Sequence, residues 1–281
     1  MKGAAPSASD SVTPVPEGGT LADNLYASKY FRLEYALPAG WSQAYSGPPP
    51  SDSGYYVLAQ LKPADTSKDK GRATILITAQ DLFFTLKPAA NALELLSSTE
   101  DHLQAEYTVE RPPTTVTVAN HPFVRFDYYS PVAGLHWYVL ATQVRCHMIQ
   151  FVFTGRDTEL LERLIHEMEK MKLPAEANPT TGAGGDDVPV CIKDYARGEN
   201  VIERADPLLT DRRFNAIPVR FVIGKDGRVK HVHFLSAYSD QAKSIADALR
   251  QWRFKRYVQG GRAAEVETGI LFGHPPRAST P

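Results

Sequence analysis

Two histidines, His231 and His233, stand two residues apart and alternate with Val232 and Phe234. Because the side chains of a strand alternate between its two faces, both imidazoles are expected on one face, where they could chelate a metal ion if a third ligand joined them. No third ligand is evident in the sequence. We therefore predict a solvent-facing strand surface and no metal site.

The other residues of catalytic type are poorly placed for catalysis. Cys146 and His147 are adjacent in an expected strand, so they point to opposite faces and cannot form a nucleophilic pair. Asp127 and His136 are the remaining acid–base candidates in the N-terminal half, and no nucleophile accompanies them. The chain has no G-x-S-x-G, P-loop, G-x-G-x-x-G or H-E-x-x-H motif. We predict that the protein is not an enzyme and that it has no cofactor.

The chain has two cysteines, Cys146 and Cys191, which allow one disulfide across its two halves. Cys146 lies in an apolar segment, which is typical of a small buried thiol, and Cys191 lies near an expected domain junction. We expect both to be unpaired, although the count permits a bridge and an oxidising compartment.

The composition limits the classes of partner. A net charge of −1 over 281 residues gives no reason to expect nucleic-acid binding. No run approaches the roughly 18 apolar residues of a membrane span, so we expect no direct membrane anchor. The aromatic pairs Tyr128-Tyr129 and Trp137-Tyr138 fit the faces of a sheet better than a binding surface.

The stretch from Ile217 to Phe272 has the most regular pattern. Val219, Phe221 and Ile223 alternate along a strand, a turn follows at Asp226-Gly227, and a second strand runs from Val229 to Leu235. Apolar residues then recur at helical spacing after Asp240, and Val266 to Phe272 is expected as a third strand.

This order resembles the C-terminal domain of the TonB family of energy transducers, over residues 188–276. The positions that match the family pattern are Asp226, Gly227, Arg228, Val229, Trp252, Phe254 and Gly261. The chain departs from the family before the first strand, where Asp206-Pro207-Leu208-Leu209 replaces the usual P-x-Y-P, and at Arg256, where a proline is common. The resemblance implies a three-stranded sheet with one main helix that binds an extended peptide by adding a strand to its edge.

The N-terminal half is expected to form an antiparallel sheet with two helices. Strands are predicted near residues 30–35, 55–61, 73–78, 116–118, 122–129, 136–141 and 145–153, and helices over 88–107 and 157–171. Asp157 is a plausible N-cap of the second helix. The opening F-x-L-x-Y-x-L-P-x-G-W and the closing helix ending MKLP resemble the PsbP/Mog1-like sandwich, over residues 30–174.

The predicted fold is therefore α+β with two domains. We expect a disordered leader over residues 1–24, the PsbP/Mog1-like domain over 25–175, a flexible linker over 176–187, the TonB-like domain over 188–276 and a tail over 277–281.

The resemblances imply a non-enzymatic binding protein of the cell envelope, located in the periplasm. Its expected partner is a protein or extended peptide, such as an outer-membrane transporter. The expected binding strand is the sheet edge formed by Glu265, Val266, Glu267, Thr268, Gly269, Ile270, Leu271 and Phe272. The alternative is a structural or accessory envelope protein whose edge is covered by the N-terminal domain or by a second copy in a homodimer.

Overall fold

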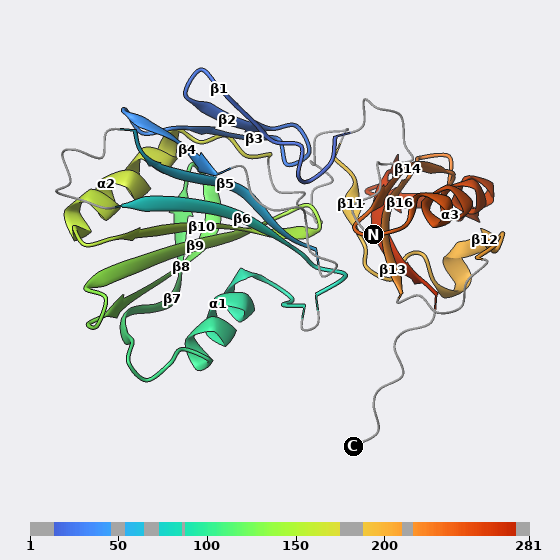
Figure 1. Ribbon diagram of the computed structural model, residues 1–281. Coiled ribbons are helices and arrows are strands. Elements are labelled where there is room, and N and C mark those ends of the chain that lie inside the picture. The colour runs from blue at the N-terminus through green and yellow to red at the C-terminus, as the bar shows by residue number, and fades with distance from the viewer. Residues whose placement is uncertain are drawn as a thin grey trace.

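The protein is described here from a computed structural model that covers residues 14–45, 54–64, 73–85, 88–174, 188–209 and 216–273. Strands account for 49% of this part and helices for 18%. The prediction of an α+β fold with two domains is therefore wrong: the molecule is sheet-rich with few helices (Figure 1). The prediction overestimated the helical content and underestimated the strand content. The helix expected over residues 88–107 spans only Ala92–Asp101 (α1), and the structure contains several short strands that have too few residues to show a sequence pattern.

The largest element is an antiparallel sheet of seven strands, in the spatial order β4-β5-β6-β10-β9-β8-β7. Its strands are β4 (Trp41–Tyr45), β5 (Tyr55–Pro63), β6 (Thr74–Asp81), β7 (Thr108–Val118), β8 (His121–Ser130), β9 (Leu135–Val144) and β10 (His147–Gly155). A separate sheet of three strands, β1 (Thr20–Ala22), β2 (Leu25–Ser28) and β3 (Leu33–Ala36), precedes them.

Both faces of the seven-stranded sheet are covered. On one face, aromatic side chains such as Tyr35 pack with residues of α2 (Thr158–Glu167), among them Leu161, into the main core. On the other face, Leu96 of α1 packs on Phe126 and its neighbours. The side chain of Asp157 accepts a hydrogen bond from Leu160 N, which confirms the predicted N-cap of α2.

Residues 14–24 are not part of a disordered leader. They include β1, which pairs with β2, and Glu17, whose carboxylate lies 3.0 Å from Nε2 of His233. Residues 1–13, the expected linker over 176–187 and the expected tail over 277–281 lie outside the described residues.

The C-terminal part is built on a sheet of four strands rather than three. Its order is β11-β18-β13-β14, where β11 is Val190–Cys191, β13 is Ile217–Ile223, β14 is Val229–Phe234 and β18 is Val266–Phe272. The helix α3 (Ser239–Gln251) covers one face, where Ile245 and Leu249 are fully buried. Short strands complete this part: β12 (Val201–Glu203) pairs with β15 (Arg253–Phe254), and β16 (Tyr257–Gln259) pairs with β17 (Arg262–Ala264).

The two parts contact each other directly. In Figure 1 the C-terminal sheet stands beside one end of the seven-stranded sheet. Asp81, at the end of β6, and Arg145, in the turn between β9 and β10, contact Arg220 and Glu267 of the C-terminal sheet. The face of this sheet opposite α3 is thus the surface on which the site is built.

Candidate functional site: the junction of the two parts

The alternation along three strands determines which residues face the junction. Val219, Phe221 and Ile223 of β13 pack under α3, so Arg220 and Val222 face the other way. In register, Arg220 lies between Gly269 of β18 and His233 of β14, and Val222 lies between Glu267 and His231. Every residue of β13 is buried, because one face meets α3 and the other meets the N-terminal part.

A buried network of charges joins the parts. Arg145 Nε donates to Glu267 Oε2 at 3.0 Å, and Arg220 Nη1 donates to Glu267 Oε1 at 3.1 Å. Arg220 Nη2 also donates to the carboxylate of Asp81, and the hydroxyl of Tyr30 donates to Glu267. Asp81, Arg220 and Glu267 are each at most 2% exposed. The two carboxylates and two guanidinium groups balance, which is the condition for burying charge.

The same network sets the pKa of the carboxyl group of Glu267. Burial alone would raise this pKa, but the adjacent charges of Arg145 and Arg220 favour the carboxylate and lower the pKa to about 2. Burial raises the pKa of the Tyr30 phenol, which therefore stays protonated and donates to Glu267. The guanidinium of Arg145 also lies 3.9 Å above the centre of the Tyr30 ring.

His147 lies beside this network in an aromatic enclosure. Its ring packs edge-on against Tyr30, Phe31 and Tyr56, with centroid distances of 5.4, 5.0 and 5.6 Å. The residue is fully buried, and neither ring nitrogen has a hydrogen-bond partner within the described residues. Burial lowers the pKa of His147 to about 3, so the imidazole is neutral at neutral pH.

A disulfide joins Cys146 to Cys191 and so links the β9–β10 turn to β11. The expectation that both cysteines are unpaired is wrong. The sequence placed Cys146 in a strand and gave no sign that residues 190–191 pair with β18, which brings the two Cα atoms to 5.3 Å.

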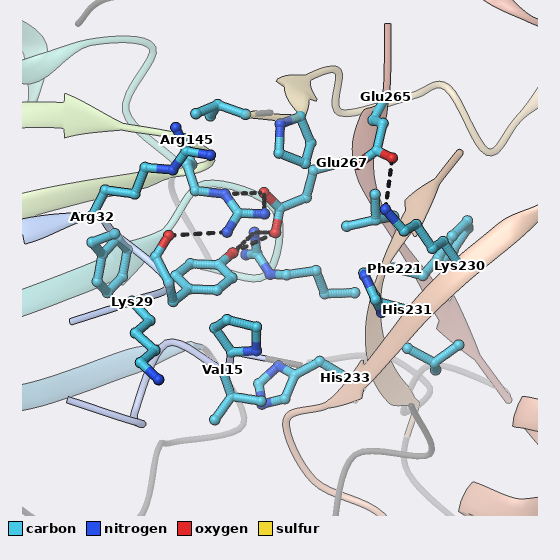
Figure 2. A pocket seen from close by; sticks show the side chains of 18 of the residues that line it. Val15, Lys29, Arg32, Arg145, Phe221, Lys230, His231, His233, Glu265 and Glu267 are labelled. Carbon is cyan, nitrogen blue, oxygen red and sulfur yellow. Dashed lines mark hydrogen bonds and ion pairs between the residues drawn. The ribbon is translucent and has the colours of Figure 1, made fainter. Parts of the chain in front are cut away.

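A cavity of about 210 Å³ lies at the junction. Figure 2 shows Lys29, Arg32, His231 and His233 around it, with Arg145 and Glu267 joined by dashed lines. The basic residues that line it are Lys29, Arg32, Arg145, Arg220 and Lys230, whereas the acidic ones are Glu265 and Glu267. Because Lys230 contacts Glu265 at 2.9 Å, both acidic residues of the lining are already paired.

The predicted binding strand is not an edge of the sheet over its whole length. β18 pairs with β13 on one side and with β11 on the other, at Val266 and Glu267. Gly269 is packed so closely that a Cβ there would lie 2.7 Å from the Phe84 ring. Leu271, in contrast, is 50% exposed. The remaining residues of the predicted set are buried or half-buried, namely Glu265, Thr268, Ile270 and Phe272.

The positions that carry the TonB resemblance have structural roles. Gly227 adopts φ +80° in the β13–β14 turn, where its N–H donates to Gly224 O and the Phe254 carbonyl lies against it. Asp226 accepts a hydrogen bond from Arg228 N, and Val229 begins β14. Trp252 and Phe254 are buried in the C-terminal core, and Gly261 has φ +79° between β16 and β17.

The acid–base candidates Asp127 and His136 are diagonal neighbours on β8 and β9, but each of them pairs with a different charged residue. Asp127 pairs with Arg125 and Arg111, whereas His136 contacts Glu110 at 2.8 Å. Burial raises the pKa of Asp127 despite these arginines. His231 and His233 do share a face, as predicted, but His233 is buried and not solvent-facing. The described residues contain no group of three or more metal-ligating side chains.

Sequence reasoning missed the charge network altogether. One available signal was Arg220, the single charged residue in the otherwise apolar strand Ile217–Ile223. A charge in the middle of a fully buried strand requires a partner, which here comes from Glu267 and Asp81. Tyr30, Asp81 and Arg145 carried no comparable signal, because they lie at turns and strand ends.

Comparison with known proteins gives only a weak structural similarity. No protein-family model and no curated protein sequence matches the chain. Among solved structures, it is similar to the solution structure of cyanobacterial PsbP (CyanoP) from Synechocystis sp. PCC 6803, at 14% identity, over 56% of this chain and 96% of that one. With a TM-score of 0.38, this similarity carries no inference about function. In the described part of the chain, no helix is long and apolar enough to cross a bilayer.

Proposed function

We propose that this chain is a non-enzymatic binding protein of the cell envelope in which the N-terminal part and the TonB-like C-terminal part take a partner together. One observation carries the proposal: the sheet face opposite α3, which a free TonB-like module would expose, is occupied by buried charges that the N-terminal part supplies. In this proposal the chain acts as an accessory protein. It is not an energy transducer whose C-terminal sheet is free to pair with a partner strand.

The disulfide supports the location in this proposal. Cys146 and Cys191 are paired, and such bonds persist in oxidising compartments such as the periplasm. The bond ties β11 to the N-terminal part, so that β11 stays on β18 and covers the backbone groups of Glu265 and Glu267, whose carbonyls accept from Val190 and Ile192. Addition of a partner strand at Glu265–Glu267 would have to displace β11.

Strand addition at the remaining part of β18 is the second candidate function. Leu271 pairs with Pro218, which has no N–H and whose carbonyl accepts from Leu235, so the backbone groups of Leu271 point away from β13. No described strand pairs with β18 beyond Glu267 on that side. A short extended peptide could form ladder hydrogen bonds with Gly269 and Leu271 there.

The experiment that separates the two candidates is chemical cross-linking of the full chain in envelope extract. Its variants are Leu271→Pro, Leu271→Ala and the double variant Cys191→Ser/Glu267→Gln, which lacks the disulfide and the shared carboxylate. Binding by both parts together is supported if wild type and both Leu271 variants recover the same partner and the double variant does not. Loss with Leu271→Pro and not with Leu271→Ala would support strand addition, since proline removes the outward donor. If no partner is recovered, both candidates fail.

A further inference from the structure

We infer that the cavity at the junction is a binding site for a small organic oxyanion, a carboxylate or phosphate group attached to an apolar body of about one ring. This inference goes beyond the proposed function and does not depend on strand addition. It rests on the charges around the cavity, on two buried nitrogens without partners, and on the apolar walls.

Among the described residues, the charges around the cavity leave a surplus of positive charge. Arg145 and Arg220 are balanced by Glu267 and Asp81, and Lys230 is balanced by Glu265. Lys29 and Arg32 also line the cavity, and neither forms an ion pair with any residue that the structure describes. Even with the carboxylate of Glu17, which contacts His233, counted against these two charges, one positive charge remains, and it attracts an anion.

Two residues of the lining each have a buried nitrogen atom with no hydrogen-bond partner within the described residues. They are Arg220, at Nε, and His233, at Nδ1. The two residues are register partners on adjacent strands, β13 and β14, and they face the same side. Nε of Arg220 is a donor, and a buried donor without a partner is costly, so an acceptor group beside it would be stabilised.

His233 bonds to Glu17 through its other ring nitrogen. Nε2 of His233 lies 3.0 Å from Oε1 of Glu17, which accepts from it. Nδ1 is therefore the ring nitrogen left for a ligand. A hydrogen bond between Nδ1 and the ligand's oxyanion group needs one proton, carried by Nδ1 or by the acid form of that group, and Arg220 adds a charge-assisted hydrogen bond.

The walls limit the rest of the ligand to a small apolar body. The apolar residues of the lining are Pro14, Val15, Phe31, Pro174, Val188, Pro189, Phe221, Val222 and Val232. The volume of about 210 Å³ exceeds the roughly 150 Å³ of an engineered cavity that binds benzene. A ligand with one ring and one oxyanion group therefore fits the cavity.

The test is isothermal titration calorimetry of the full oxidised chain with phenyl phosphate, benzoate and neutral phenol. We expect saturable binding of phenyl phosphate, benzoate or both, with an affinity about tenfold or more above that of phenol. The probe that binds more tightly shows whether the site prefers a phosphate or a carboxylate. Arg32→Ala should weaken oxyanion binding about tenfold, whereas Arg163→Ala, an exposed arginine on α2 that does not line the cavity, should leave it unchanged.

Two substitutions at His233 test the buried nitrogen without removing the side chain's polarity. The amide nitrogen of His233→Asn can take the place of Nδ1, whereas that of His233→Gln can take the place of Nε2 toward Glu17. Weaker binding in the Gln variant than in the Asn variant, with both variants folded by thermal denaturation, would support the site. The inference is overturned if neither oxyanion binds, if phenol binds as tightly, or if Arg32→Ala and His233→Gln leave binding unchanged.

Discussion

At the scale of single residues, the junction depends on Glu267. This carboxylate is 1% exposed and contacts both arginines of the network and the hydroxyl of Tyr30. A buried network of this kind adds little net stability relative to an apolar core, but it is very sensitive to the loss of one partner. We expect it also to favour this arrangement of the two parts, because each of its charges has an oppositely charged partner here.

Neutralising Glu267 should therefore destabilise the protein strongly. We expect Glu267→Gln to lower the free energy of unfolding by about 3–5 kcal/mol, since Arg145 and Arg220 lose their shared carboxylate. Glu265→Gln, two residues earlier and directly before β18, breaks only the pair with the half-exposed Lys230 and should cost about 0–1 kcal/mol. Urea unfolding of both variants measures the difference. Equal effects would contradict a network that holds the parts together.

His147 makes a prediction about pH. The ordinary pKa is 6.5 and the pKa in the folded protein is about 3, so the unfolded chain takes up the proton first as the pH falls. Stability from this residue is complete above pH 6.5 and is lost progressively between about 6.5 and 3. By pH 5 the loss should reach about 2 kcal/mol.

The check is the variant His147→Phe, which keeps an aromatic ring among Tyr30, Phe31 and Tyr56 and has no titrating group. Its free energy of unfolding should fall less than that of wild type between pH 7 and pH 5. The exposed His166 on α2, changed to Gln, serves as the control. An unchanged pH dependence in His147→Phe would show that this imidazole is not buried in the neutral form.

At the scale of elements, the sequence predicts long and regular segments well. The alternation and helical spacing place β13, β14, β18 and the beginning of α3 within one or two residues of their observed limits. β7 was expected only at residues 116–118 because its first part, TVERPPT, is largely exposed and contains two prolines, so that it lacks a pattern of alternating burial.

The elements that build the junction were the ones that could not be predicted. β11 has only two residues and pairs with β18 across a separation of more than seventy residues, and no local pattern marks such a contact. Its presence removes part of the expected edge. The prediction of the edge rested on the pattern from Ile217 to Phe272, and it failed where a segment before that stretch came to lie beside β18.

At the scale of the whole molecule, the two main cores are separate. The N-terminal core extends from Tyr26 to Met171 and the C-terminal core from Tyr195 to Phe272, and no residue belongs to both. The contacts that couple them include the charge network, the disulfide and the packing of Gly269 on Phe84. We therefore expect the cooperative unfolding of the two parts to depend on these contacts.

We expect the oxidised wild-type protein to unfold in a single thermal transition, with equal calorimetric and van't Hoff enthalpies, because each core is held in place by the other. The double variant Cys191→Ser/Glu267→Gln should instead unfold in two transitions, since the covalent link and the shared carboxylate are both absent. Differential scanning calorimetry measures both cases, and the double variant Cys191→Ser/Glu265→Gln, which keeps the charge network, separates the effect of the network from that of the disulfide. Two transitions in the wild-type protein would contradict the proposal that both parts act together, because either part could then open without the other.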